Sequence, residues 1–491
     1  MHPQTPDDRP ARPERAVGIS ILGIAALALV AGGCQSYERR PMDLARHSAE
    51  YLARTPESPE VRDFAASLAG DGVAQRTGFD IADGLTCPEA EVVGLVFNAD
   101  LRVARLRAGV TRAGADNAGL WEDPTIGVDL TKIIQSTPEP WKAFATVGLT
   151  IPISGRLEIE KQQAGMEHAA ELARVAQREW EVRMEIRRAW TDWSAMENRL
   201  STTRDFVASV DQVLAIADRM EQAGEIPRTE ARLFRIEKAT RLTELGVLEL
   251  QVLQAELRLK HLMGLSPDAA VVWQPAGIGP GCSANNDDHA PDSGELTARS
   301  PAMIVAAAEY EVSERTLELE IRKQYPDLHI GPGYGNEDGY DQVLLGLSVP
   351  LPVLNGNRRG IAEARARREL ARAGAETTLE RLNVMSRTAQ VRLESTRRQR
   401  EAFERDVVPL VDAQYADARQ IAQLGEVSTL VLLESLTRRQ EAKVRLIDAR
   451  RDEALARIEM QELSGPPALP PAASPDSLRA DQSGAHPSSS H

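Results

Sequence analysis

Two segments of the chain alternate between apolar residues and small or polar residues. Residues 121–152 and 325–352 each contain two such runs, and the apolar members of the first run include Ile126, Val128 and Leu130. Alternation with period two indicates β-strands with one apolar face. Runs of about 10 residues also match the length of a tilted membrane strand. The pattern therefore predicts two strand pairs, which are either membrane strands or an ordinary sheet with one wet face.

A long helical segment follows each strand pair. Ser154 to Gly224 spans 70 residues without a proline, and Gly360 to Gly425 spans 65 residues that are interrupted by Pro409 alone. At 1.5 Å per residue, each segment would be about 100 Å long. The returning segments have apolar residues every three or four positions, which predicts coiled-coil packing between helices. These seam positions are Leu245, Leu248, Val252, Ala255, Leu259 and Leu262 in the first segment, and Ala442, Leu446, Ala449, Glu453, Ala456, Met460 and Leu463 in the second, where Glu453 is one polar break.

The strand pairs and the helical hairpins belong to a tandem repeat. Four ordered matches, at offsets of 198 to 202 residues, pair 123–127 with 325–331, 148–152 with 346–350, 224–226 with 425–427, and 262–264 with 463–465. Each repeat contains a short helix, a strand pair and a long helical hairpin. The order predicts a mostly α fold with a small β part. Four strands cannot close a barrel alone, so a membrane-spanning role would require several chains in one barrel.

The composition divides the chain into six predicted segments. These are a signal peptide at 1–33, an N-terminal lipid-anchored segment at 34–82, repeat 1 at 83–274, a linker at 275–294, repeat 2 at 295–465, and a disordered tail at 466–491. The linker is predicted from its Gly, Pro, Asn, Asp and Ser content. The tail is predicted from its Pro, Ala, Ser and Gly content.

The N-terminus has the pattern of an export signal. Three arginines precede an apolar run at 17–31, and small residues then lead to Cys34. As a helix, this run would measure about 22 Å, which is short of a ~30 Å hydrocarbon core and typical of a signal peptide. The segment resembles a bacterial lipobox, in which Cys34 would carry the lipid. An ordinary cleavable signal and a single anchor are the alternatives.

Charge and motif content exclude several classes of function. The chain has 58 Lys+Arg and 73 Asp+Glu, and its net charge of −15 disfavours nucleic acid as a partner. Three cysteines exclude a disulfide-rich scaffold and a multi-cysteine zinc module. The sequence contains neither a His-Glu-x-x-His motif nor a Gly-x-Ser-x-Gly motif. We therefore predict no enzymatic activity, no cofactor and no metal site.

Several short stretches carry a resemblance to a known family. They are Gly84-Leu85-Thr86 with 97–101, Leu120-Trp121-Glu122-Asp123-Pro124 before the first strand, and Pro409, Tyr415 and 425–430 around the second hairpin turn. Together with the repeat, these stretches resemble the TolC-type outer-membrane efflux proteins, and specifically the outer-membrane factor lipoproteins of tripartite efflux systems. The resemblance covers residues 83–465.

The resemblance implies an assembly and a function. It implies a homotrimer whose chains form one 12-stranded outer-membrane β-barrel, with four strands from each chain, continued by a long coiled-coil α-barrel. The duct would be anchored in outer-membrane lipid and extend into the periplasm. It would passively conduct substrates that are delivered by a periplasmic adaptor protein and an inner-membrane pump. The transported substrate is left open.

The resemblance also assigns roles to particular residues. The hairpin tips would dock the adaptor, through Gly224, Glu225 and Ile226 in repeat 1 and through Gly425, Glu426 and Val427 in repeat 2. Glu230 and Glu434 would line the closed aperture, where carboxylates favour cations. Cys87 and Cys282 would meet at the middle of the α-barrel, either as a disulfide or as two free thiols.

Two other functions fit the same sequence features. The first is the export duct of a type I protein secretion system, which would have the same fold. The second is a lipid-anchored periplasmic coiled-coil scaffold that never spans the membrane. The aromatic residues beside the alternating runs, among them Trp121, Trp141 and Tyr340, argue against the scaffold because they are typical of membrane interfaces.

Overall fold

The structure, a computed structural model, describes residues 36–70, 79–134, 141–274, 289–337, 340–423 and 429–466. The chain divides into two units, residues 1–51 and 52–491. In the first unit, helix α2 (Leu44–Leu52) is stabilised by an ion pair between Arg46 and Glu50. All other elements lie in the second unit. Within the described residues, no helix has the length and apolarity that a membrane crossing requires.

The second unit contains the same order of elements twice. Helix α3 (Pro59–Gly70) precedes the first set, which is α4 (Cys87–Phe97), α5 (Ala99–Asp116), β1 (Thr125–Lys132), β2 (Trp141–Ile151), α6 (Arg156–Ala223) and α7 (Arg228–Leu262). The second set is α8 (Ser293–Arg299), α9 (Pro301–Arg322), β3 (Leu328–Glu337), β4 (Tyr340–Ser348), α10 (Arg358–Ala402), the π-helix η3 (Phe403–Val407), α11 (Val408–Gln423) and α12 (Thr429–Ser464). The predicted mostly α fold with a small β part, built from a tandem repeat, is confirmed.

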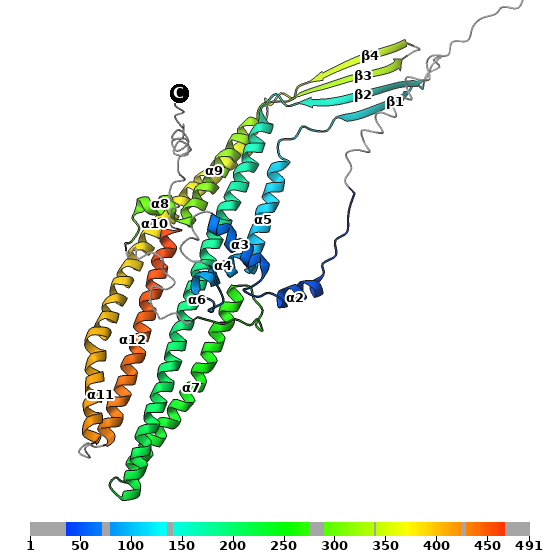
Figure 1. Cartoon of the computed structure of the whole chain (residues 1–491). Helices are drawn as coiled ribbons and strands as arrows, with labels where there is room; N and C mark the ends of the chain where they lie inside the picture. The colour runs from blue at the N-terminus through cyan, green and yellow to red at the C-terminus, as the bar shows by residue number, and fades with distance from the viewer. Residues whose placement is uncertain are drawn as a thin grey trace, which may run out of the picture. The chain divides into compact units, whose positions relative to one another are not determined.

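Helix α6 joins the two repeats. Its 68 residues correspond to about 100 Å of helix. It packs against α5 and α7 of its own repeat and against α9 and α12 of the other repeat (Figure 1). The apolar seam of α7 faces α6, where Leu248, Val252 and Leu259 are buried, as the periodicity predicted. The two hairpins therefore bury their seams side by side.

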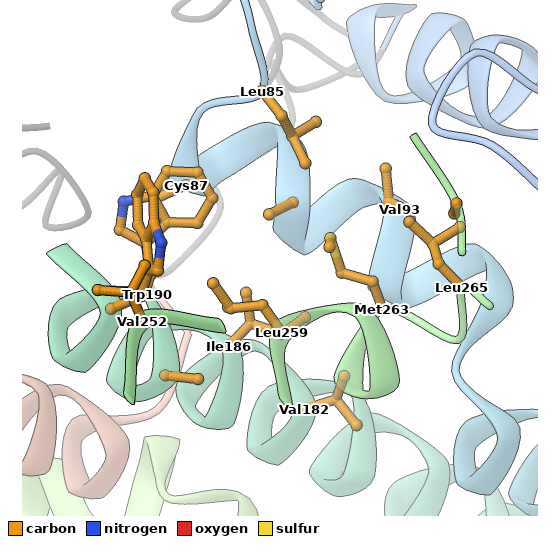
Figure 2. Packing of buried hydrophobic residues seen from close by; sticks show 14 of the residues in the cluster. Leu85, Cys87, Val93, Val182, Ile186, Trp190, Val252, Leu259, Met263 and Leu265 are labelled. Carbon is orange, nitrogen blue, oxygen red and sulfur yellow. The ribbon is translucent and has the colours of Figure 1, made fainter. Parts of the chain in front are cut away.

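The largest cluster of buried apolar residues joins the start of repeat 1 to α6 and α7. Figure 2 shows Leu85 and Val93 from the start of the repeat packed on Ile186 and Trp190 of α6 and on Leu259 of α7. Leu85 also forms a parallel bridge with Trp273, which brings the first and last residues of the repeat together. Trp190, Trp193 and Trp273 form a group of edge-to-face and tilted contacts with ring centroids 5.2–5.8 Å apart. Such large buried aromatic rings contribute much of the apolar area in a helical core.

The polar break in the second seam is a buried ion-pair site. Glu453 is 5 % exposed, and it accepts hydrogen bonds from Arg400 of α10 and from Arg457 on its own helix at 2.9 Å. Arg397 of α10 approaches the same carboxylate at 3.8 Å. A buried carboxylate is tolerated only when it is paired and hydrogen-bonded. The break therefore fixes the alignment of α12 against α10.

Pro409 changes the geometry of the second long helix. A proline has no backbone N–H to donate to the carbonyl four residues earlier. The π-helix at Phe403–Val407 lies directly before it and contains Arg405, the residue four positions earlier. A π-bulge is a known cause of local helix distortion. The long helix of repeat 2 therefore consists of α10, η3 and α11, whereas α6 of repeat 1 is one continuous α-helix.

One glycine at the end of each repeat packs on the start of that repeat. Gly264 after α7 has a φ of +70°, and a Cβ there would lie 2.1 Å from the carbonyl oxygen of Phe97. Gly465 after α12 has a φ of +72°, and a Cβ there would lie 2.2 Å from the carbonyl oxygen of Arg299. Phe97 ends α4 and Arg299 ends α8, so both glycines contact the break between two short helices. These positions explain the match between 262–264 and 463–465.

We expect the substitution Gly264→Ala to destabilise the protein by at least about 1–3 kcal/mol, because the left-handed backbone and the close carbonyl both exclude a side chain. Gly165→Ala, inside α6 with open space around it, should instead be neutral or stabilise by up to about 1 kcal/mol. Thermal unfolding followed by circular dichroism measures both effects. Equal melting temperatures for the two variants would contradict this packing.

Candidate functional site

The four strands form one antiparallel sheet in the order β1-β2-β3-β4. β2 pairs with β3, so the sheet crosses the boundary between the repeats. Ile126 pairs with Val147, Leu149 with Ile330, and Ile330 with Leu347. The ladder between β2 and β3 skips two positions of β3, Gly331 and Pro332, and the nitrogen of Pro332 cannot donate a hydrogen bond.

This register gathers the apolar residues on one face of the sheet. Because side chains of one strand alternate between faces, paired residues share a face. One face therefore carries Ile126, Val128, Leu130, Ala143, Ala145, Val147, Leu149, Ile151, Leu328, Ile330, Pro332, Tyr334, Val343, Leu345 and Leu347. The opposite face carries mainly Gly, Thr, Ser, Gln and charged residues, with Phe144, Tyr340 and Leu344 as the large exceptions. The alternation predicted from the sequence is confirmed on all four strands.

The apolar face is open to the surroundings in the single chain. Val343 is 84 % exposed, and Ile126, Val128, Leu130, Leu345 and Leu347 are also exposed. The two outer strands, β1 and β4, each pair on one edge only within the part of the chain that the structure describes. A large exposed apolar surface marks a contact with lipid or protein, and an open strand edge invites another strand. The sheet is therefore the part of the chain that most requires a partner.

An ion-pair group connects the sheet to α6. Arg156, the first residue of α6, donates to Asp327 at 2.7 Å and to Glu122 at 2.6 Å. Asp327 precedes β3 and also accepts from the backbone N–H of Ser154 at 3.3 Å. These contacts link the start of α6, which follows β2, to the residue just before β3 and to the segment before β1. They hold the sheet in a fixed position on the helices.

The hairpin turn between α6 and α7 lies at the opposite end of α6 (Figure 1). Gly224 ends α6 with a φ of +77°, and the N–H of Glu225 donates to the carbonyl of Met220 at 2.9 Å, as in a Schellman motif. Glu225 is exposed, whereas Ile226 is half-buried in a cluster that includes Phe206 of α6 and Leu432 of α12. Glu230, in the first turn of α7, is half-buried.

The second predicted tip lies outside the described residues. Gly425, Glu426 and Val427 belong to this unplaced turn. Glu434, on α12 beyond it, is exposed and pairs with Arg438 at 2.5 Å one turn further along the same helix. An exposed pair of this kind contributes little to stability, but it lowers the local negative charge around Glu434.

A charged group also lies where η3 meets α12. Glu404 of η3 accepts from Arg450 of α12 and from Arg400 of α10, each at 2.5 Å. The hydrogen bond from Arg450 and the neighbouring Arg400 hold the pKa of Glu404 below its ordinary value of 4.5. The carboxylate thus stays charged under mildly acidic conditions and keeps the π-helix tied to α12.

The lowered pKa of Glu404 predicts a pH-dependent contribution to stability. A carboxyl group with a lowered folded-state pKa stabilises the protein above its unfolded pKa, and that contribution is lost as the pH falls through the folded pKa. Between about pH 5 and about pH 3, the melting temperature should therefore fall more for the wild type than for Glu404→Gln. Glu380→Gln, on the exposed surface of α10, serves as the control. Parallel curves for the wild type and Glu404→Gln would contradict the assignment.

One of the three cysteines, Cys87, lies within the described residues. Cys87 is 2 % exposed in the core cluster and is disulfide-bonded. Its partner lies outside the described residues, as do Cys34 and Cys282. The Cys87–Cys282 pairing and the lipidation of Cys34 stay predictions. Within the described parts of the chain, no group of three or more His, Cys, Asp or Glu residues is arranged to hold a metal ion.

Sequence reasoning missed the buried charges. Glu91 of α4 is 4 % exposed and accepts from Arg187 at 2.5 Å and from Arg183 at 2.8 Å, both on α6. Arg187 also donates to Gln461 of α12 at 3.0 Å, so this network links both repeats. No local pattern could have revealed it, because the partners come from three distant helices in a chain with 73 acidic residues. The Arg156 group was missed for the same reason.

Residues 95–265 match the outer membrane efflux protein family. The matched segment runs from the end of α4 to the residues just after α7 and includes β1, β2 and α6. The resemblance that the motifs predicted is thereby confirmed. A comparison with curated protein sequences gives no match.

Solved outer-membrane channels have the same fold as this chain. The outer-membrane channel OprN is 18 % identical, with a TM-score of 0.64, and the match covers 89 % of this chain and all of that one (100 %). CusC, described in a study of folding and transmembrane channel formation, is 14 % identical with a TM-score of 0.66, at 77 % and 92 % coverage. The Campylobacter jejuni outer membrane channel CmeC is 14 % identical with a TM-score of 0.63, at 78 % and 86 % coverage.

Proposed function

We propose that the chain is one of three identical subunits of an outer-membrane exit duct of a tripartite efflux pump. The duct conducts substrates passively from a periplasmic adaptor and an inner-membrane pump to the outside, with no chemical step of its own. Both the outer membrane efflux family match and the likeness to solved channels support this proposal. The observation that carries it is the sheet with one continuous apolar face and two open edges.

The tandem repeat indicates how copies would join. Within the chain, β2 of repeat 1 pairs with β3 of repeat 2, and α6 packs on α12. The equivalent contacts between copies would pair β4 of one copy with β1 of the next and would pack α10 and α11 on the next copy's α7. A head-to-tail contact that repeats by rotation closes a ring. Every strand edge would then be paired.

The in-chain register predicts the register between copies. Ile151 pairs with Leu328, and the repeat offsets of 198 and 202 residues transfer this pair to Val349 and Ile126 of the next copy. Leu347 would then face Val128, and Leu345 would face Leu130. In this register, the apolar faces of the two sheets coincide without any adjustment. A register slipped by one residue would place apolar residues opposite polar ones.

The helices offer a matching surface. Along its length, helix α7 has a row of apolar residues that are each 40–55 % exposed in the described chain, namely Leu233, Ile236, Leu242, Val247, Leu250, Leu253 and Leu257. An isolated row of this length is unusual on a soluble helix surface. Coverage by α10 and α11 of the next copy would bury it, just as α12 covers α6 within the chain. The helices would then line a tunnel below the barrel.

The strand count favours more than two copies. Two copies would give eight strands, which enclose little more than their own side chains. Three copies give 12 strands, which leave a lumen. Small residues on the polar face, including Gly127, Gly148, Gly331 and Gly346, would line that lumen. Three is also the number that the family resemblance implies.

We assign the remaining roles by position. The tip at Gly224, Glu225 and Ile226, and the second tip at 425–427, would dock the adaptor at the periplasmic end. Glu230 and Glu434 would lie near the aperture at that end. Cys34 would anchor the chain in outer-membrane lipid.

Cysteine pairs test the proposed ring directly. Val128→Cys together with Leu347→Cys should give a disulfide between copies in isolated outer membranes, because facing residues on adjacent strands have Cβ atoms about 5 Å apart. Electrophoresis without reductant should show dimers and trimers of the chain.

The matched control is Val128→Cys with Ser348→Cys. These positions lie on opposite faces in the proposed register, so this pair should crosslink at least about tenfold less, since its side chains point apart. Equal crosslinking by both pairs would contradict the register. The absence of any crosslink in either pair would contradict the ring.

A further inference from the structure

Helices α6 and α10 both begin with an arginine directly after a strand pair. Arg156 is the first residue of α6 and Arg358 is the first residue of α10. Both are preceded by a residue in the left-handed conformation, Gly155 with a φ of +71° and Asn357 with a φ of +51°. A positive charge at a helix N-terminus is unfavourable, because the helix dipole is positive there. Each arginine therefore needs an acidic partner.

Only one of the two arginines has such a partner in the described chain. Arg156 is held by Asp327 and Glu122, as described above. Arg358 is exposed and forms no ion pair with any described residue, and the first turn of α10 has no acidic residue. The same holds for Asp123, which is exposed and pairs with no described residue. Arg359, beside Arg358, is also exposed and forms no ion pair with a described residue. The described chain thus has unmatched positive charge after β4 and an unmatched negative charge before β1.

The repeat places these two charges at the same boundary. Within the chain, Arg156 follows β2 and its partner Asp327 precedes β3, the strand that pairs with β2. Between copies, Arg358 follows β4 and Asp123 precedes β1 of the next copy, the strand that would pair with β4. The acids flank equivalent prolines, since Asp123 precedes Pro124 and Asp327 follows Pro326.

The loop before Arg358 is longer than the loop before Arg156, so Arg358 can lie further from the end of its strand. Nine residues separate β4 from α10, whereas four residues separate β2 from α6. The longer loop includes Leu351, Val353 and Leu354, which are 75–92 % exposed. Leu120 and Trp121, just before Asp123, are exposed as well. Contact between these two apolar groups would shield the ion pair from water.

We propose that Arg358 of each copy forms an ion pair with Asp123 of the next copy and so closes the ring at the base of the sheet. The pair would lie at the boundary between copies that corresponds to the Arg156–Asp327 boundary within the chain, with Asp123 two positions before Thr125, the residue that aligns with Asp327. This inference rests on the proposed function, because it requires neighbouring copies. It assigns a partner to Arg358 that the family likeness does not supply.

A charge exchange tests the pair in the full chain purified in detergent. Arg358→Asp and Asp123→Arg each place like charges at the boundary, and the double variant restores opposite charges. One exposed pair changes an equilibrium constant by about 1.4- to 5-fold, so three pairs should change oligomer dissociation by about 3- to 100-fold. Mass photometry over a dilution series should show this loss in each single variant and recovery in the double variant.

Arg359→Asp is the matched control. It places the same new charge on the neighbouring residue of α10, and an acidic residue in this first turn favours the helix. Its oligomer should dissociate like the wild type, so a loss confined to Arg358→Asp must come from the contact between copies.

Two outcomes would overturn the ion pair while leaving the duct intact. One is a wild-type oligomer with unchanged dissociation in both single variants. The other is a loss in Arg358→Asp alone without recovery in the double variant, which would indicate that Arg358 binds a lipid phosphate. A wild-type chain that is monomeric in both detergent and crosslinked membranes would instead contradict the proposed function itself.

Discussion

The structure depends on a sheet that cannot be satisfied within one chain. Its register places fifteen apolar or aromatic positions on one face, and no described helix covers them. Its outer strands, β1 and β4, leave one edge each without a partner strand in the described chain. Exposed apolar area and open strand edges both carry a large cost in water. In the proposed assembly, lipid around the sheet and further copies of the chain would remove both costs together.

The helices pack on one another and support the sheet. α6 packs on α4, α5, α7, α9 and α12. The buried charge at Glu91 links α4 to α6, and the buried charge at Glu453 links α12 to α10. The glycines at 264 and 465 close each repeat onto its own start. The two repeats thereby form a stiff support, and the unsatisfied surfaces remain on the sheet, on α7 and at the hairpin tips.

Local patterns were enough to predict the periodic parts of the fold. The strand alternation, the seam at Leu248, Val252 and Leu259, and the repeat matches all follow from side-chain periods of two and of three to four, which sequence records directly. The role of Glu453 could not be predicted, because the sequence does not show which arginines of α10 pair with a polar residue in the seam. The Arg156 group joins residues 122, 156 and 327, and such distant pairings leave no periodic signal.

The features of the candidate site also differ in how far the sequence predicts them. The apolar face of each strand pair was predictable from the alternation, whereas the pairing of β2 with β3 across the repeats was not. The roles of the tips were predicted by resemblance alone, and the geometry adds the left-handed Gly224 and the Arg438 partner of Glu434. Cys34, Cys282 and residues 425–427 lie outside the described residues, so the structure adds nothing to those predictions.

The central claim is that several copies of the chain complete one hollow structure through their sheets. Electron microscopy of the full chain, extracted from membranes in detergent, tests it most directly. The account predicts particles with threefold symmetry, an open centre, and helices that continue for about 100 Å below a shorter barrel. Single copies, or solid rods without a central opening, would contradict it.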